Sequence, residues 1–474
     1  LNFKKLIFKE LVLKHTFFSV SFSASSSAHR VASFGRGLAV LLFCFVLSGC
    51  DKIFDQPKEN VQLENKVKIN SQGLLSAANI YAYTQMSEAL NQAQILDGLI
   101  TSLLHHPNPL SLEEAQNTWL KAYQAYLQVS FFHQIPRLEN PKYHEDGDSY
   151  QMIHEQLDSW PIEAGYIDYL PQYPLSGIIN DMTLKITEQG ILQQHGFSDQ
   201  RFASVGFHPM EFILFGVDGK RSAKDFVPQE NSIETVDTDI HGQEHGQELG
   251  QESEQEPTQD EIAAQQQAIE DAEKVGHNHD ASDTLSPQNH NRRREFLRLL
   301  SAMMVTNLQK LADRWEPAHG YYAKQWRQPQ HVQNLQRIYQ VSMDSLQVEL
   351  LNKHMHPLLT LAQLEDLRSP FAQHDGANML AILQGVENLF FVENGFMQEL
   401  KVHHAETADK ITAQFKRLMR DMKKVPVNLA TQSLKKRQKV ITPVQQKLIT
   451  LIEHLYAGAE ILGLPLEALP VSTN

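Results

Sequence analysis

The sequence predicts an all-α protein with two helical regions that a disordered acidic insert separates. Apolar residues recur at helical spacing on both sides of this insert. Residues with this spacing include Ala115, Trp119, Ala122, Tyr123 and Tyr126, and the pattern returns over 296–315, 379–390 and 441–455. Runs in which apolar and polar residues alternate, as in strands, are scarce.

Residues 1–49 are predicted to be a signal region that is removed. Arg30 and Arg36 precede an apolar run over 38–47, which is too short to span a bilayer as a helix. The run ends in Leu-Ser-Gly-Cys at Cys50, which resembles the lipobox of bacterial lipoproteins. This resemblance implies a lipid anchor on Cys50 that holds the chain on the periplasmic side of the inner or outer membrane of the bacterial cell envelope.

The polar stretch 50–70 is predicted to be the lipidated tether, and 71–228 the first helical bundle. Cys44 is lost with the signal and Cys50 carries the lipid. The mature chain therefore has no free thiol, which excludes disulfides, thiol catalysis and thiolate metal ligands.

The segment 229–290 has a different composition and divides the helical regions. It contains 16 acidic residues against one basic residue, Lys274, and no aromatic residue. Such a segment cannot bury enough apolar surface to offset the entropy of ordering, so we predict disorder. Its histidines, such as those in "HGQEHGQE", either capture divalent metal loosely or belong to a solvated linker. The stretch 291–474 is predicted to be the second helical bundle.

The stretch "GFHPMEFILFG" (206–216) is the first candidate site, because two polar side chains interrupt an apolar run. On a helix, His208 and Glu211 lie on one face. An imidazole and a carboxylate suit iron, zinc or manganese. A buried pair joined by a hydrogen bond is the other interpretation, and the two residues alone do not decide between them.

Other sharp motifs are missing: we find no phosphate loop, no nucleophile elbow and no HExxH pair. "HEQLD" (154–158) comes nearest to the last, and we expect it to be a solvated helix face. There is also no basic patch with interleaved aromatic residues, so nucleic acid is not an expected partner.

Five segments in order resemble the imelysin-like family of bacterial envelope proteins. The stretch 206–216 matches its Gly-x-His-x-x-Glu signature, and "SWPIEAGYIDYL" matches its Trp-Pro segment. The other three are "TWLKAYQAYLQVSFF", "RRREFLRLLSAMMVTNLQKLADRWEP" and "RSPFAQHDGANMLAILQGVENLF". The resemblance implies two helical bundles with the signature facing the groove between them.

For function, the resemblance implies either an iron-regulated or iron-binding protein or a metal-dependent peptidase. It makes His208 and Glu211 candidate ligands of a divalent or ferric ion, with iron favoured and zinc possible. Glu211 would be catalytic only in a peptidase. Candidate groups lining the groove are Glu163, Asp168, Arg368 and Ser369.

This chain departs from the family pattern mainly by losing charged groups. Tyr123 stands where the family has arginine, Ser130 where it has glutamate, and Asn378 where it has aspartate. A hydrolase tolerates such losses poorly, whereas a binding protein tolerates more. We therefore expect a membrane-anchored lipoprotein that binds a metal ion or an iron-linked small ligand and acts in iron or metal uptake. An iron transporter or a cytochrome is a candidate partner, and a metal-dependent peptidase is the alternative.

Overall fold

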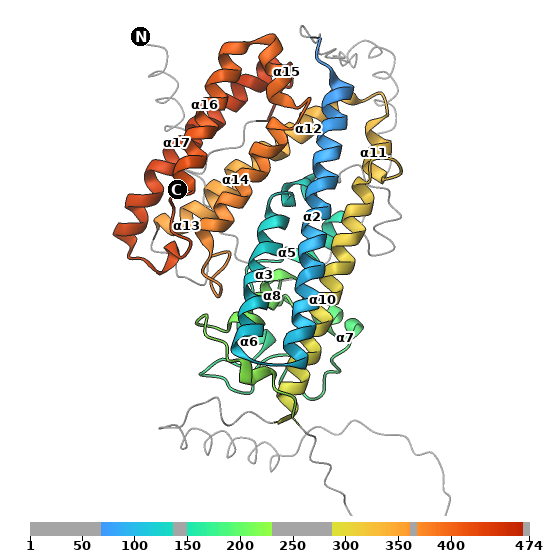
Figure 1. Ribbon diagram of the computed structural model, residues 1–474, viewed down its shortest axis with the longest axis vertical. Coiled ribbons are helices and arrows are strands. Elements are labelled where there is room, and N and C mark those ends of the chain that lie inside the picture. The colour runs from blue at the N-terminus through green and yellow to red at the C-terminus, as the bar shows by residue number, and fades with distance from the viewer. Residues whose placement is uncertain (1–67, 136–148, 230–286, 361–366, 468–474) are drawn as a thin grey trace, which may run out of the picture. The chain divides into compact units, whose positions relative to one another are not determined.

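The structure, a computed structural model, describes residues 68–135, 149–229, 287–360 and 367–467 (Figure 1). These residues are helical or in loops and contain no β-strand, which confirms the predicted all-α class; only Leu170 and Tyr173 form an isolated bridge. The predicted signal region, Cys50, nearly all of the tether and nearly all of the acidic insert lie outside the described residues. None of the helices within these ranges is long and apolar enough to cross a membrane.

Three long helices form the frame of the first bundle: α2 (Ser71–His105), α3 (Pro109–Leu127) and α10 (Pro287–Trp315). Helix α2 lies between the other two and packs along both (Figure 1). A buried stripe of small side chains allows this close packing, and it comprises Ala78, Ala82, Ala89 and Ala93. Helix α3 begins at a capping box, in which Asn108 and Ser111 satisfy each other's backbone N–H groups.

The sequence-based boundary at residue 291 assigns nearly all of α10 to the second half, whereas its contacts place it in the first bundle. Besides α2, it packs on α5 (Tyr150–Asp158) and α8 (Phe207–Phe215). The apolar face that carries Phe296, Leu300 and Leu308 is buried in these contacts. The spacing of apolar residues predicts such a face but not the helix that covers it.

Shorter elements complete the first bundle. They are η1 (Ser130–Gln134), α6 (Ala164–Ile167), α7 (Glu188–Gln194), η3 (Ala223–Phe226) and α11 (Tyr321–Trp326).

The second bundle follows α11 along the chain. It consists of α12 (His331–Asp344), the π-helix η5 (Ser345–Met355), α13 (His356–Leu359), α14 (Asp375–Phe391), α15 (Phe396–His403), α16 (Ala405–Met422), η7 (Leu429–Thr431) and α17 (Leu434–Ile461). Helices α16 and α17 pack against each other as a hairpin (Figure 1). An amphipathic α16 buries Ile411, Phe415 and Leu418 and leaves its charged face exposed.

The two bundles meet where α14 crosses the end of α3. The hydroxyl of Tyr81 on α2 lies 3.0 Å from the carbonyl oxygen of Gln128 and 2.7 Å from that of Gly385. A Cβ atom on Gly385 would lie only 2.2 Å from the Gln128 carbonyl oxygen. Glycine is therefore required at this point on α14, because the two backbones touch.

Candidate functional site

Helix α8, which carries the His208–Glu211 pair, is completely buried and begins at a glycine that no other residue could replace without strain. Gly206 has φ 103°, and a Cβ atom there would lie 2.5 Å from the carbonyl oxygen of Gln156. This close approach places the first turn of α8 against the end of α5. His208 on α8 consequently lies beside Asp158, the last residue of α5.

The imidazole of His208 lies between two carboxylates. Its Nε2 atom is 3.0 Å from Oδ1 of Asp158, and its Nδ1 atom is 3.4 Å from Oε2 of Glu211. Burial opposes a charge on this ring, but the hydrogen bonds to Asp158 and Glu211 outweigh it and raise the pKa of His208. The ring can satisfy both carboxylates only when both of its nitrogens carry protons. Trp160 covers it, with 4.8 Å between the ring centroids.

The other carboxylate oxygen of Glu211 is held by the second bundle. Its Oε1 atom accepts hydrogen bonds from the hydroxyl of Ser369 at 2.9 Å and from the backbone N–H groups of Phe371 and Ala372 at 3.2 and 2.8 Å. These donors belong to the loop before α14. The Glu211 carboxylate therefore joins α8 to the second bundle.

Asp158 continues the buried chain toward solvent. Its Oδ2 atom accepts from Nη2 of Arg368 at 2.8 Å, and its Oδ1 atom accepts from the hydroxyl of Tyr123 at 3.1 Å. Burial alone would raise the pKa of Asp158, but Arg368 and His208 lower it well below its usual range. The carboxylate therefore stays ionised, and it fixes the guanidinium of Arg368 at the junction of the two bundles.

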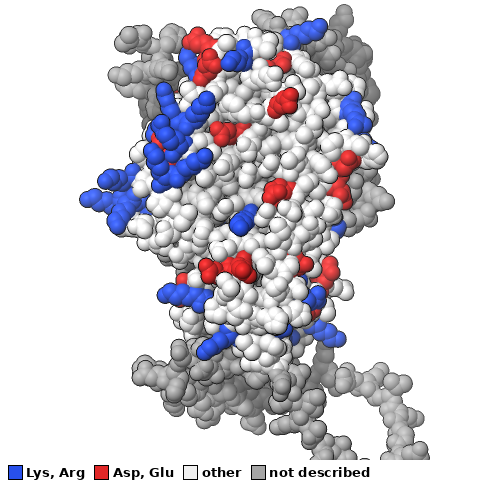
Figure 2. Space-filling model, in the orientation of Figure 1, with Lys and Arg blue, Asp and Glu red and all other residues white. Residues whose placement is uncertain are grey.

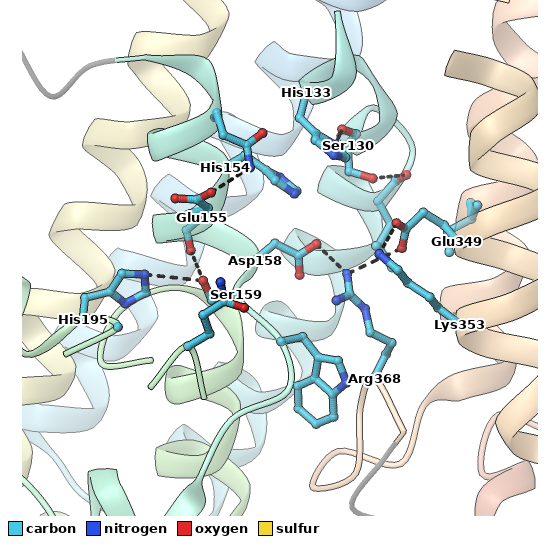
Figure 3. Close-up of a pocket in the computed structure, with 16 residues that line it drawn as sticks. Ser130, His133, His154, Glu155, Asp158, Ser159, His195, Glu349, Lys353 and Arg368 are labelled. Carbon is cyan, nitrogen blue, oxygen red and sulfur yellow. Dashed lines mark hydrogen bonds and ion pairs between the residues drawn. The ribbon is translucent and has the colours of Figure 1, made fainter. Parts of the chain in front are cut away.

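A polar cavity of about 500 Å³ opens beside Asp158 and Arg368 (Figure 3). The first bundle supplies η1, α5 and nearby loop residues, and the second supplies η5, α14 and Arg368. The cavity therefore lies between the bundles. Its polar side chains, seen together in Figure 3, include Ser130, His133, His154, Glu155, Asp158, Ser159, His195, Glu349, Lys353 and Arg368.

Neutral histidines form one side of the cavity. The rings of His133 and His154 stack with 3.7 Å between centroids and 6° between planes. Burial, together with the neighbouring His133, lowers the pKa of His154 to about 3, and burial also lowers the pKa values of His133 and His195. At neutral pH these rings are uncharged, and the Nδ1 atom of each is already hydrogen-bonded within the protein.

Charged side chains form the opposite side. On the π-helix η5, Lys353 lies 2.6 Å from Glu349, whose carboxylate is also 3.9 Å from Nη2 of Arg368. Two cations, Lys353 and Arg368, thus line the cavity together with three carboxylates, those of Glu155, Asp158 and Glu349. Such a lining can bind a small polar molecule through charged and neutral hydrogen-bonding groups.

A comparison with protein families agrees with this architecture: a family model described as Imelysin matches residues 81–462. The chain belongs to the imelysin family. Its fold is also that of two solved structures, each 12% identical in sequence. One is described as an iron-regulated protein A precursor from Parabacteroides distasonis (TM-score 0.53; 83% of this chain and 94% of that chain covered). The other is an imelysin-like protein from Psychrobacter arcticum (TM-score 0.51; 84% and 97% covered). No curated protein matches.

Within this imelysin-family fold, four predicted site residues come together: His208, Glu211, Arg368 and Ser369 form one connected network. Glu163 and Asp168 do not line the cavity. Glu163 is exposed at the start of α6. Asp168 is fully buried elsewhere, where its carboxylate is held by Arg293 at 2.7 and 3.0 Å.

Sequence reasoning also missed part of the cavity wall. The expectation that "HEQLD" is a solvated helix face is wrong, because His154, Glu155 and Asp158 all line the cavity. The near-match to a metal-binding pattern was the signal that could have identified these residues. Glu349 and Lys353 had no such signal, since nothing in the sequence marks the π-helix that presents them.

The His208–Glu211 pair does not fit a metal ion in this arrangement. Both ring nitrogens of His208 face carboxylates, and Oε1 of Glu211 already accepts three hydrogen bonds. Both side chains are completely buried, and the Arg368 guanidinium lies on the far side of Asp158. Among the residues that the structure describes, no group of three or more His, Cys, Asp or Glu side chains is arranged to hold a metal.

Proposed function

We propose that this imelysin-family protein binds a small carboxylate-bearing ligand in the cavity between its bundles, with a ferric chelate as the first candidate. The observation that carries the proposal is the cavity itself, where Lys353 and Arg368 can contact an anionic group of a ligand although three carboxylates and three neutral histidines share the lining. Its volume of about 500 Å³ is in the range of small-molecule sites. One protein of the same fold is described as an iron-regulated protein A precursor, which supports a link to iron and to export.

In this proposal the hydrogen-bonded side chains of His208, Asp158 and Arg368 hold the cavity wall in place and do not bind a metal. Asp158 and Glu211 hold His208 from both sides, and Asp158 orients the Arg368 guanidinium toward the cavity. The protein would act on the periplasmic side of the envelope, tethered through Cys50, and would serve iron uptake by presenting the chelate to a transporter or a cytochrome.

Calorimetric titration of the purified protein with citrate, ferric citrate and ferrous ion tests the proposal. We expect citrate or its ferric chelate to bind, and Lys353→Ala to weaken binding by about tenfold, because a charge-assisted hydrogen bond is lost. Lys220→Ala is the matched control, since Lys220 is 82% exposed and remote from the cavity. Failure of both citrate forms to bind, or equal binding by the Lys353→Ala variant, would overturn the proposal.

The alternative, a metal-dependent peptidase, has less support from the geometry. A peptide bond cannot reach Glu211, because its carboxylate has no exposed surface and its oxygens already accept hydrogen bonds. Incubation with an unfolded protein substrate tests this alternative. Cleavage that stops on adding a chelator, and that the His208→Ala variant lacks, would establish the peptidase instead.

A further inference from the structure

The end of the α16–α17 hairpin is strongly basic, although the whole chain has a formal net charge of −14. Between residues 411 and 450 there is one acidic residue, Asp421. The same stretch contains ten basic residues: Lys416, Arg417, Arg420, Lys423, Lys424, Lys435, Lys436, Arg437, Lys439 and Lys447. Apart from the buried Arg437 and the half-buried Lys447, these basic residues are exposed. Figure 2 shows Lys and Arg side chains gathered over this part of the surface. We call these exposed residues the basic hairpin end.

The fold does not neutralise this charge. Asp421 alone pairs with Arg420, Lys424 and Lys447. Among the described residues, no ion pair involves the rest of the basic hairpin end, namely Lys416, Arg417, Lys423, Lys435, Lys436 and Lys439. Uncompensated like charges at close range destabilise a folded chain. The basic hairpin end therefore costs stability, as surfaces that recognise an anionic partner do.

The loop that joins the two helices adds an apolar tip to this surface. Pro426 is exposed and Val427 is 49% exposed. Lysines 423 and 424 precede this tip, and lysines 435 and 436 follow it. Exposed apolar side chains flanked by cations suit a bilayer surface, where the apolar groups enter between the headgroups and the cations contact phosphate.

Nucleic acid and an acidic protein account for the surface less well. Single-stranded nucleic acid binds to exposed aromatic side chains, whereas the only aromatic residue over 411–450 is Phe415, which is buried. An acidic protein would match the charge but gives no reason for an exposed Pro-Val tip between two lysine pairs.

We propose that the basic hairpin end binds the surface of a bilayer that contains anionic phospholipids. The contact involves only side chains of this hairpin, so it is independent of the cavity and of any ligand there. Together with the lipid predicted on Cys50, it would be a second membrane contact, and two weak contacts hold a protein at a membrane far better than one.

Vesicle co-sedimentation tests the proposal. The full chain would carry Cys50→Ser in every sample, so that no acyl chain contributes. Vesicles of phosphatidylcholine alone would be compared with vesicles that contain an equal share of phosphatidylglycerol, at low salt and at about 0.5 M salt, where charges are screened within a few ångströms. We expect binding only to the anionic vesicles, and its loss at high salt.

Charge-removing variants locate the contact. Each lost lysine should weaken binding by about fivefold, so Lys435→Gln/Lys436→Gln should weaken it by about 25-fold. Lys220→Gln/Lys224→Gln removes the same charge from exposed positions of the first bundle and should leave binding unchanged. Val427→Ser should weaken binding to the anionic vesicles at low salt. Unchanged thermal unfolding midpoints would show that the variants fold.

Two results would overturn the inference. One is equal binding of the wild type to neutral and anionic vesicles, or to neither. The other is an equal effect of the Lys435/Lys436 and Lys220/Lys224 double variants, which would indicate attraction by net charge and not by this surface.

Discussion

Replacing Asp168 by alanine should destabilise the protein strongly, because it leaves buried cations without their partner. The Asp168 carboxylate has no exposed surface. It accepts from Nε and Nη2 of Arg293 at 2.7 and 3.0 Å, and it lies 3.3 Å from Nη2 of Arg221. Arg293 is also completely buried and, among the described residues, has no other carboxylate at this distance, whereas Arg221 keeps Asp225 at 3.1 Å. Breaking a buried pair by removing one partner typically costs about 3–5 kcal/mol, and the two-point contact with Arg293 suggests the upper part of this range.

Urea unfolding followed by circular dichroism measures this cost. Asp168→Ala should lower the free energy of unfolding by about 4–5 kcal/mol at neutral pH. Asp168→Ala/Arg293→Met should recover part of the loss, because the stranded charge is then absent. The exposed pair of Asp199 and Arg201, 3.2 Å apart, provides the control, since Asp199→Ala should leave the midpoint unchanged.

The pH dependence supplies a second check on the same ion pair. Burial would raise the pKa of Asp168, but Arg293 and Arg221 lower it overall. Its stabilising effect is therefore complete above the unfolded pKa of about 4 and is lost as pH falls through the lower folded pKa. A loss below about 1 kcal/mol at neutral pH, with an unchanged denaturant slope, would refute the assignment of a structural ion pair to Asp168.

Three further predictions concern the junction between the bundles. Burial raises the pKa of Asp375 to about 7, so the folded state keeps a proton that the unfolded state releases, and stability falls as pH rises from about 4 to 7. In urea unfolding, the stability of Asp375→Asn relative to the wild type should be about 3 kcal/mol higher at pH 8 than at pH 5. An equal difference between the two proteins at both pH values would contradict this prediction. Gly385→Ala should lower the thermal unfolding midpoint, because the new Cβ atom would lie 2.2 Å from the Gln128 carbonyl oxygen and such crowding costs about 1–3 kcal/mol. An unchanged midpoint would show that α14 and the end of α3 separate easily. Tyr123→Phe removes a hydrogen bond to Asp158 and should cost about 1 kcal/mol in urea unfolding, and a gain in stability would indicate a strained hydroxyl.

The features that the sequence predicts correctly depend on neighbours along the chain. Helices α3, α10, α14 and α17 follow from the period of their apolar residues. The contact between His208 and Glu211 follows from a spacing of three on one helix. The protonated state of that histidine does not follow, because it depends on Asp158, which is 50 residues away.

The features that the sequence does not predict depend on contacts between distant segments. Asp168 belongs to a matching family segment, yet its position is set by Arg293, which is 125 residues further on. Glu349 and Lys353 face the cavity because a π-helix turns them there, and helical period alone cannot distinguish a π-helix from an α-helix. Helix α10 has the apolar face expected of it, but nothing in that face indicates which bundle it completes.

The side chain of Asn291 closes the gap across the acidic insert. Its Oδ1 atom accepts from the backbone N–H of Gln229 at 3.2 Å, and its Nδ2 atom donates to the Gln229 carbonyl at 2.8 Å. The chain thus leaves and re-enters the fold at neighbouring points, and the entropy of closing a loop rises only slowly with its length. For protein engineering, the segment between Gln229 and Asn291 is therefore a suitable position for inserting another domain. A fluorescent reporter with adjacent termini could replace 230–286 and would label the protein there.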